Sequence, residues 1–427
     1  MKVKKLIAIV MALTVLGTTV GCGGEKDAEE LAKKSKKESE GEVLDLWTRG
    51  SETDVTGPYL LEAVKQYEKE TGIKVNVQFI AHDDVITKWN SAFASGTAPD
   101  IIDLGIVHIA ERANLKHIIP LDEYYEKWEN KDQLIPAMKD LGMYDGKQYA
   151  IAHFPDPQIF AYRKDMFEEA GLDPNHAPEN WDQLLEYAEK LTVRDESGNI
   201  TRGGMAVPTV QARFMANYMV HQNDASFVDE EKGLPTFDTP GALETIEFMD
   251  ELHEYSTIFD NANWGENPFF KDSAAMAYIP NGNLKNYLKE NPDMKDKIGV
   301  AACVPGKQPA SWSGVWFYGI TSQAENPDKA FDLISYLTSE EVLESRVEKV
   351  GLPSAFSYNE DAYVALDPEI NQAVMDAIAC GYGNPKVSWA PLYEQTLDQL
   401  TEEVFYDTKT PEEALKDAQE SLMKEIK

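Results

Sequence analysis

The chain has 427 residues and a formal net charge of −34 at pH 7. This length exceeds what one ordinary hydrophobic core serves, so we expect two domains or two lobes. The strong negative charge repels nucleic acid and anionic lipid, which excludes nucleic acid as a partner.

Cysteine is scarce, with Cys22, Cys303 and Cys380 as its three positions. This number excludes a disulfide framework. Cys303 and Cys380 either form one bridge or stay two separate buried thiols, and we favour the thiols. No Cys-x-x-Cys pair or Cys/His cluster indicates zinc, and we expect no metal and no other cofactor.

Residues 1–21 have the pattern of a secretory signal peptide. Lysines among the first five residues precede an apolar run, Leu6–Leu16, which is too short to span a bilayer. Small residues then lead to Cys22, as in a bacterial lipobox, whose cysteine is acylated and becomes the first mature residue. Thr19 departs from this motif, which prefers Leu, so ordinary signal cleavage is the alternative.

Residues 22–41 contain the charged segment EKDAEELAKKSKKESEG, which has almost no large apolar side chain. Such a composition is typical of a disordered tether. We therefore expect an extracytoplasmic protein that is anchored to the outer face of the cell membrane by a lipid on Cys22.

The next segments alternate between strand and helix patterns. A β-α-β-α-β order within about sixty residues is typical of a parallel sheet with helices on its faces. The segments are a strand at Glu42–Trp47, a helix from Pro58 to a stop at Gly72, a strand at Ile73–Phe79, a helix at Val85–Phe93 closed at Gly96, and a strand at Asp100–Leu104.

Helical and hairpin patterns follow, and the strand pattern then begins again after Gln158. Three helix starts carry capping residues, namely Asn180 with Gln183, Asn326, and Thr410 with Glu413. The predicted elements are helices at Leu121–Trp128 and Leu134–Leu141, a hairpin at Tyr144–Ile151, helices at Trp181–Leu191, Arg213–Gln222 and Gly241–Tyr255, a strand AAMAYI, and a strand at Trp316–Thr321.

Several segments, taken in order, resemble extracellular solute-binding protein family 1, the sugar-binding receptors of bacterial ABC importers. The most specific are SGTAPDIIDLG, IPLDEYY, GKQYAIAHFPDPQIFAYRKDMFEEAGLD, APENWDQLLEYAEKLT, FFKDSAAMAYIPNG and WFYGITSQAENPDKAFDLISYLTSEE. The resemblance extends over residues 42–427.

The resemblance implies an α/β, periplasmic-binding-protein-like fold with two lobes, each a mainly parallel sheet flanked by helices. Residues 42–155 and 310–352 would form lobe 1, and residues 156–309 and 353–427 would form lobe 2. Three hinge crossings are expected, near His153–Gln158, Pro305–Ser313 and Val350–Ser354. These segments are rich in Pro, Gly or Ser, as expected of a hinge.

A sugar presents apolar ring faces and an edge of hydroxyls, so its site needs aromatic rings and planar polar groups. We expect these on loops after strands, at the carboxyl ends of the sheets. Asp83 also fits as a helix cap, Asn281 and Asn283 fit simple turn chemistry, and Trp316 is expected in the core. The candidate ligand-binding residues are Arg49, Glu52, His82, Asp83, His108, Asp156, Gln211, Arg213, Trp264, Asn281, Asn283, Trp312, Gly314 and Trp389.

The resemblance implies a receptor that captures a carbohydrate, which we expect to be an oligosaccharide, and delivers it to the membrane subunits of an ABC permease. No amphipathic surplus or heptad pattern suggests an oligomer, so we expect a monomer. A secreted glycosidase would need two carboxylates across a cleft, and their abundance here decides nothing. No G-x-S-x-G, H-E-x-x-H or P-loop is present, so we expect no enzyme.

A non-sugar solute on the same fold, such as a polyol phosphate, an acidic sugar or a metal, stays open. Tyr124-Tyr125 resembles the tyrosine pair of ferric-binding relatives, but its helical setting favours a structural role.

Overall fold

The structure, a computed structural model, describes residues 43–54, 56–261 and 263–426. The predicted signal peptide and tether, with Cys22, lie outside the described residues. Residues from Leu44 onward form one compact unit. Among the described residues, no helix combines the length and the apolar composition needed to cross a membrane.

The first half of the unit is an α/β layer built as its sequence pattern predicts. β1 (Val43–Arg49) pairs in parallel with β3 (Ile101–Gly105), and β2 (Lys74–Ile80) lies beside β1. Between them, α2 (Gly57–Thr71) begins with a proline in its first turn, and α3 (Val85–Ser95) follows β2. Gly72 and Gly96 end these helices at φ values of 77° and 73°, a backbone conformation that glycine adopts without steric cost.

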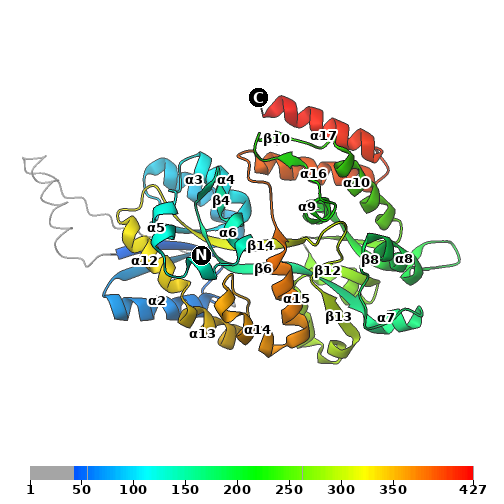
Figure 1. Cartoon of the computed structure of the whole chain (residues 1–427), viewed down its shortest axis with the longest axis horizontal. Helices are drawn as coiled ribbons and strands as arrows, with labels where there is room; N and C mark the ends of the chain where they lie inside the picture. The colour runs from blue at the N-terminus through cyan, green and yellow to red at the C-terminus, as the bar shows by residue number, and fades with distance from the viewer. Residues whose placement is uncertain (1–42, 55, 262, 427) are drawn as a thin grey trace, which may run out of the picture. The chain divides into compact units, whose positions relative to one another are not determined.

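β6 (Ile151–Arg163) and β14 (Ser311–Ile320) join the two halves through one continuous mixed sheet (Figure 1). β14 pairs antiparallel with β3 and with β6, and β6 continues antiparallel to β12 (Ala274–Pro280). The predicted hinge at His153–Gln158 therefore lies inside a regular strand. Its two prolines face Val315 and Ser313 in the ladder instead of forming an irregular linker.

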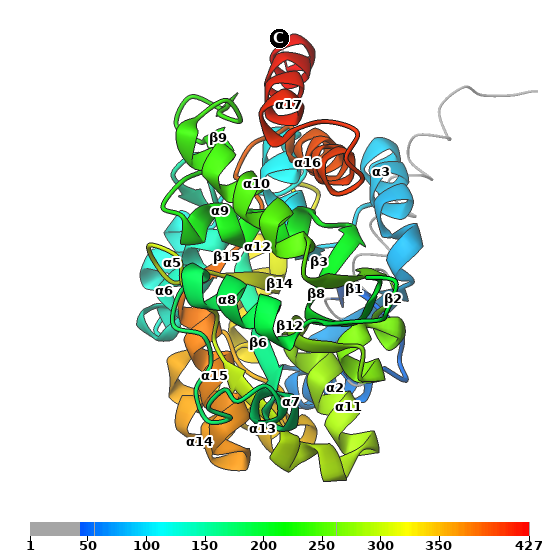
Figure 2. The same ribbon diagram turned by 90° about the vertical axis from the view of Figure 1, so that its right-hand side faces the viewer.

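In the second half, β8 (Ile200–Val210) pairs in parallel with both β12 and β11 (Ser256–Asp260). Figure 2 shows helices covering this part of the sheet. They are α8 (Trp181–Leu191), α9 (Arg213–Gln222), α10 (Pro240–His253), α16 (Ala390–Phe405) and α17 (Pro411–Glu425). Their apolar side chains form a second core with Phe160, Met205 and Tyr278 from the sheet.

The three predicted helix caps are confirmed. Asn180 Oδ1 accepts a hydrogen bond from the Gln183 backbone N–H at 2.9 Å, and Asn326 Oδ1 accepts one from Lys329 at 3.2 Å. Thr410 forms a reciprocal capping box with Glu413. These signals depend on residues three apart, so the sequence alone is sufficient to find them.

The segments on both sides of the third predicted crossing contain helices that the sequence patterns did not indicate. α13 (Glu340–Val350), α14 (Glu360–Leu366) and α15 (Pro368–Ala379) follow one another, and Tyr363 and Ile378 enter the same core cluster as Leu104. The division into lobes stays a prediction. The other elements are β4 (Met143–Tyr144), β5 (Lys147–Gln148), β7 (Val193–Arg194), β9 (Val228–Asp229), β10 (Leu234–Pro235), β13 (Ile298–Ala301), β15 (Gly381–Tyr382), α4 (Ile109–Asn114), α5 (Asp122–Lys127), α6 (Pro136–Leu141), α7 (Lys164–Glu169), α11 (Asn281–Glu290) and α12 (Pro327–Leu337). Cys303 and Cys380 are free thiols, of which Cys303 is buried.

Candidate functional site

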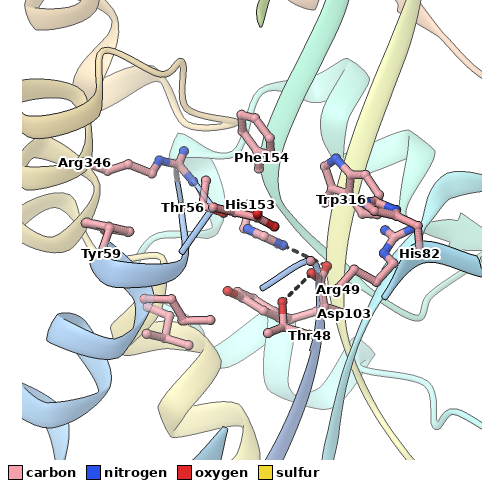
Figure 3. A pocket seen from close by; sticks show the side chains of 15 residues that line it. Thr48, Arg49, Thr56, Tyr59, His82, Asp103, His153, Phe154, Trp316 and Arg346 are labelled. Atoms are coloured by element: carbon pink, nitrogen blue, oxygen red, sulfur yellow. Dashed lines mark hydrogen bonds and ion pairs between the residues drawn. The ribbon is translucent and has the colours of Figure 1, made fainter. Parts of the chain in front are cut away.

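A cavity of about 150 Å³ lies where β1 and β3 end and where β6 and β14 cross the unit (Figure 3). We call it the arginine pocket. Its lining residues are Thr48, Arg49, Gly50, Asp54, Thr56, Tyr59, Leu60, His82, Asp103, His153, Phe154, Trp316, Tyr318, Leu337 and Arg346.

The strand registers explain why distant residues meet here. β1 and β3 pair in parallel with Trp47 opposite Ile102, which brings the next residue of each strand, Thr48 and Asp103, side by side. On the other edge of β3, Trp316 of β14 faces Gly105. The carboxyl ends of parallel strands share one edge of a sheet, and ligand sites of open α/β sheets gather there.

Arg49 lies flat on an aromatic ring. Its Cζ atom is 3.0 Å from the centroid of the Trp316 indole, and the His82 ring meets the same indole edge-on at 5.5 Å. Gly105 also leaves room for the Arg49 guanidinium, because a Cβ atom at position 105 would be 3.2 Å from Arg49 Nη1. Burial lowers the pKa of Arg49 to about 10, although the nearby Asp103 opposes the shift.

Asp103 forms the polar floor of the pocket. Its carboxylate is buried and accepts hydrogen bonds from Thr48 Oγ1 at 2.8 Å and from His153 Nε2 at 3.1 Å. Burial alone would raise the pKa of Asp103, but His153, Arg49 and Thr48 together hold it below its ordinary value. Burial also lowers the pKa of His153, against the effect of Asp103, and the His153 ring stacks on the Tyr318 ring with 3.9 Å between their centroids.

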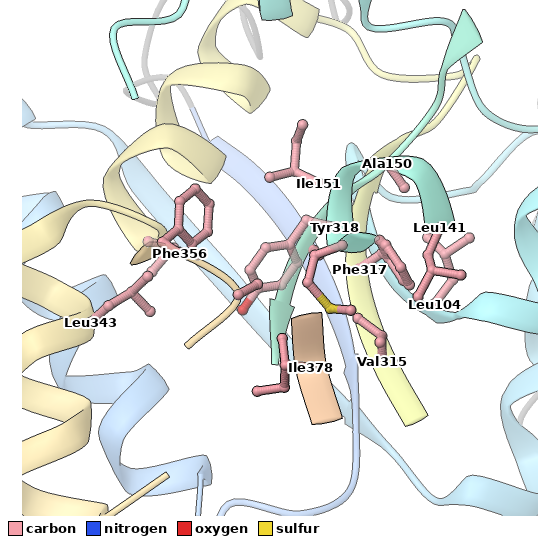
Figure 4. Packing of buried hydrophobic residues seen from close by; sticks show 14 of the residues in the cluster. Leu104, Leu141, Ala150, Ile151, Val315, Phe317, Tyr318, Leu343, Phe356 and Ile378 are labelled. Atoms are coloured by element: carbon pink, nitrogen blue, oxygen red, sulfur yellow. The ribbon is translucent and has the colours of Figure 1, made fainter. Parts of the chain in front are cut away.

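The ring of Tyr318 connects the pocket to the core beneath it. Figure 4 shows this ring among Ile151, Leu343 and Phe356. These apolar side chains come from β6, from α13 and from the loop after α13, and all are buried. The polar floor therefore rests on a packed layer, which holds the pocket in one geometry.

Arg346 enters the pocket from α13. Its side chain is buried, with 3% of the residue exposed, and its Nη2 donates to the Pro353 carbonyl at 2.8 Å. Its guanidinium lies over the Phe154 ring at 5.7 Å and pairs with no carboxylate of the described residues. Burial lowers the pKa of Arg346, because desolvation disfavours its charged form.

A second polar cluster lies where β6 meets the start of α11. Asp156 Oδ1 accepts a hydrogen bond from the Gly282 backbone N–H at 3.1 Å. Burial raises the pKa of Asp156 to about 6, against the effects of Gly282 and Lys285. Lys285 in turn donates to the Tyr363 hydroxyl at 2.8 Å. The cluster therefore holds an acid that changes its charge within a mildly acidic range.

Sequence comparison identifies the family. The profile described as bacterial extracellular solute-binding protein matches residues 50–344. The chain belongs to this family. Its members are the substrate-binding proteins of ABC transporters, act outside the cytoplasm and are not enzymes, so our prediction of a non-enzymatic receptor is confirmed.

Individual relatives agree with this assignment. The solute-binding protein is 24% identical to the arabinooligosaccharide-binding protein of Halalkalibacterium halodurans, over 82% of each chain. It is 23% identical to the sn-glycerol-3-phosphate-binding periplasmic protein of Escherichia coli, over 77% of this chain and 80% of that one. The crystal structure of an ABC transporter solute-binding protein from Thermotoga lettingae, bound with α-D-tagatose, superposes with a TM-score of 0.73 at 25% identity, over 90% of this chain and 99% of that one. The predicted α/β, periplasmic-binding-protein-like fold is thus confirmed.

The structure distributes the predicted ligand residues over several places. Arg49 and His82 line the arginine pocket. Trp264 and Asn283 line a separate cavity of about 460 Å³ beside α11, and Asn281 is buried with both of its side-chain polar atoms unpartnered among the described residues. The site is therefore not one contiguous pocket but at least two groups of residues on different elements.

The two tryptophans of β14 have the opposite surroundings to those expected. Trp312 is 7% exposed and packs on Phe214 in the second core, so the structure corrects its predicted ligand role. The expectation that Trp316 is a core residue is wrong, because its indole is half-buried and lines the pocket. Alternation along β14 puts both residues on the same face, since they are four apart. Their surroundings differ because Trp312 packs on Phe214 of α9, whereas Trp316 lies opposite Gly105 of β3.

Arg213 also differs from its prediction. Its guanidinium forms an ion pair with Asp398 and has Nε 3.4 Å from a Glu394 carboxylate oxygen. The charge of Arg213 is thus already balanced by α16, and it is not free for a ligand. No local sequence pattern could indicate this ion pair, because 185 positions separate Arg213 from Asp398.

The remaining predicted residues lie away from the arginine pocket. Trp389 Nε1 donates to the Gly233 carbonyl at 3.1 Å, and the His108 ring packs edge-on against Trp89 at 5.5 Å. Glu52 is exposed and Gln211, at a φ of 58°, is half-buried. A Cβ atom on Gly314 would be 3.0 Å from the Asp156 carbonyl. The side chain of Asp83 lies outside what the structure describes.

Sequence reasoning missed much of the pocket, namely Tyr59, Asp103, His153, Phe154, Trp316 and Arg346. Asp103 carried a usable signal, because it is a lone acid within the buried strand Ile101–Gly105. No sequence signal distinguished Arg346, since it lies on a helix among other charged residues. Of the paired tyrosines, Tyr124 donates to Asp328 and Tyr125 to the Lys131 carbonyl, and the described residues contain no cluster of metal-ligating side chains.

Proposed function

We propose that this solute-binding protein captures a carbohydrate, an oligosaccharide, and delivers it to the permease of an ABC importer. One observation carries the proposal. The arginine pocket is lined by the aromatic side chains of Trp316, Phe154 and Tyr59 and by planar donors of Arg49 that have no partner among the described residues. Aromatic faces stack on sugar rings and planar donors pair with hydroxyl oxygens.

The relatives support this class of ligand. One relative is named for arabinooligosaccharides, and one similar structure holds a sugar. Neither name specifies the ligand of this chain, and the solute of the third relative, sn-glycerol 3-phosphate, widens the range to phosphorylated polyols.

Residues outside the pocket complete the proposed site when the lobes close. Asp156, Gly314 and Asn281 border the region where β6 and β14 cross, and Trp264 extends it on the other side. Closure around the ligand stabilises the form that the permease recognises, because the ligand contacts both lobes only in that form. Glu52, Asp83, His108, Gln211, Asn283 and Trp389 stay proposed contacts of this closed form.

A thermal-shift screen tests the function. Purified protein is heated with arabino-, malto- and manno-oligosaccharides and with amino acids as the comparison class. A ligand that binds only the folded state at 100 times its Kd stabilises it by about 2.7 kcal/mol. We expect at least one carbohydrate to raise Tm by several degrees, and this rise to disappear in Trp316→Ala. A shift with amino acids and none with carbohydrate would contradict the proposal.

We further propose that a lipid on Cys22 anchors a monomer to the outer face of the membrane, next to its permease. A diacylated cysteine supplies the two chains that stable anchoring needs. In cell fractionation, Cys22→Ala is expected in the medium, whereas Cys303→Ala, a matched control, stays in the membrane fraction. Retention of the Cys22→Ala protein in that fraction would contradict the anchor.

A further inference from the structure

Two arginines share the arginine pocket without a carboxylate of their own. In Figure 3, Arg346 extends from α13 toward Thr56 and His153, while Arg49 lies beside Trp316 and His82. Arg49 Nε and Nη2 and Arg346 Nε are buried and lack a hydrogen-bond partner within the described part of the chain. Unpaired buried donors are costly, so a structure keeps them where a ligand supplies the acceptors.

The acids that line the pocket do not balance these two charges. The Asp103 carboxylate is already engaged by His153 and Thr48. Asp54 accepts hydrogen bonds from the Ser51 hydroxyl and backbone N–H, at 2.8 and 2.7 Å, on the exposed loop after β1. The pocket lining therefore holds two guanidinium groups and two carboxylates, of which Asp103 is buried and Asp54 is exposed, and neither carboxylate forms an ion pair with Arg49 or Arg346 among the described residues.

We propose that the arginine pocket recognises an anionic saccharide, with the oxyanion of the ligand, a uronate carboxylate or a sugar phosphate, on the free donors of Arg49. This inference rests on the proposed carbohydrate function and specifies its ligand class. The ligand charge supplies the missing partner for Arg49, and charge-assisted hydrogen bonds to a guanidinium are stronger than neutral ones. A neutral sugar offers these donors only uncharged acceptors.

The surroundings favour an anionic sugar over a free anion. Trp316 is already covered on one face by Arg49, while Phe154 and Tyr59 line the same pocket on the side of Arg346. An inorganic ion would leave this aromatic surface without a partner, whereas a sugar ring covers it. Gly105 seats the Arg49 guanidinium on Trp316, which fixes the direction of its Nε and Nη2 edge before the ligand arrives.

Isothermal titration calorimetry with matched ligands tests the inference. The panel pairs galacturonate oligomers with galactose oligomers and glucose 6-phosphate with glucose, and it adds sn-glycerol 3-phosphate, inorganic phosphate and acetate. We expect one anionic member to bind at least 10-fold more tightly than its neutral partner, and this preference to weaken as salt increases. The carboxylate and phosphate pairs distinguish the two sources of the oxyanion.

Variants test which side chain causes the preference for the anionic saccharide. Arg49→Gln is expected to remove it, with an unchanged Tm, and Arg49→Lys to keep part of it. Arg194→Gln is the matched charge control, because Arg194 is exposed and its hydrogen bonds among the described residues go to the backbone carbonyls of Gly198 and Glu254. A preference that survives Arg49→Gln overturns the inference.

The other outcomes separate the two proposals. Equal binding of neutral and anionic partners overturns the anionic preference but supports the carbohydrate function. Inorganic phosphate or acetate that binds as tightly as the sugars also overturns the inference, because the pocket is then a simple anion site. No binding by any saccharide overturns the proposed function itself.

Discussion

Arg49 and Arg213 are the same residue type, both follow a strand and both were predicted to bind ligand, yet their surroundings differ. Arg213 lies between Asp398 and Glu394 of α16, so its charge is neutralised within the fold. Arg49 lies between Trp316 and Gly105, with unpartnered donors in a cavity. The comparison shows that the partners supplied by the fold decide whether a cation is structural or available to a ligand.

The two tryptophans of β14 give the largest expected contrast. Trp312→Ala opens a hole in the second core and should lower the free energy of unfolding by about 3–5 kcal/mol. Trp316→Ala should cost much less stability, because its ring is half-buried, but should weaken saccharide binding at least 10-fold. Urea denaturation and calorimetry measure the two effects. A Trp312→Ala protein as stable as the unmodified protein would contradict the structural role of Trp312.

Removing each arginine in turn tests whether its charge stabilises the fold. Arg213→Gln leaves two partly buried carboxylates of α16 without their partner and should lower the free energy of unfolding by about 1–3 kcal/mol. Arg49→Gln should leave that free energy nearly unchanged, because Arg49 has no paired carboxylate to lose. Denaturant curves at low and high salt measure this. Equal losses in both variants would mean that Arg49 is also structural.

Asp156 provides a pH-dependent test near the same crossing. Its pKa is about 6 in the folded protein, above the ordinary value of about 4, because it is buried. Between these values the folded state binds more protons than the unfolded state, so the contribution of Asp156 to stability falls as pH rises from 4 to 6. Asp156→Asn should therefore stabilise the protein by about 1–2 kcal/mol at pH 8 and hardly at pH 4. A stability gain of the same size at pH 4 and at pH 8 would contradict the raised pKa of Asp156 in the folded protein.

Gly105 gives the smallest effect. Gly105→Ala adds a Cβ atom 3.2 Å from Arg49 Nη1, at a backbone φ of −80° that alanine tolerates. The displaced guanidinium should weaken anionic saccharide binding by about 3- to 10-fold. In an Arg49→Gln background the same substitution should have no further effect on affinity, which a double-mutant cycle detects. Additive losses would show that Gly105 does not act through Arg49.

Local signals were enough to predict much of the fold. Caps such as Asn326 act three residues away, and the alternation in β1 and β2 follows from which face is buried. The site depends on contacts that no local pattern encodes. Thr48 meets Asp103 across 55 positions, and Arg346 reaches the pocket from a helix that the patterns did not indicate. Arg49 and His82 could be predicted because Arg49 ends β1 and His82 lies two residues after β2, at the same sheet edge.

A crystal structure of the protein with a galacturonate oligomer or a sugar phosphate tests the central claim most directly. The account predicts density for the ligand in the arginine pocket, with its oxyanion at hydrogen-bond distance from Arg49 Nε or Nη2 and a sugar ring against the pocket aromatics. A ligand that instead displaces the ion pair of Arg213 with Asp398, or that contacts Arg49 through neutral hydroxyls alone, would contradict it.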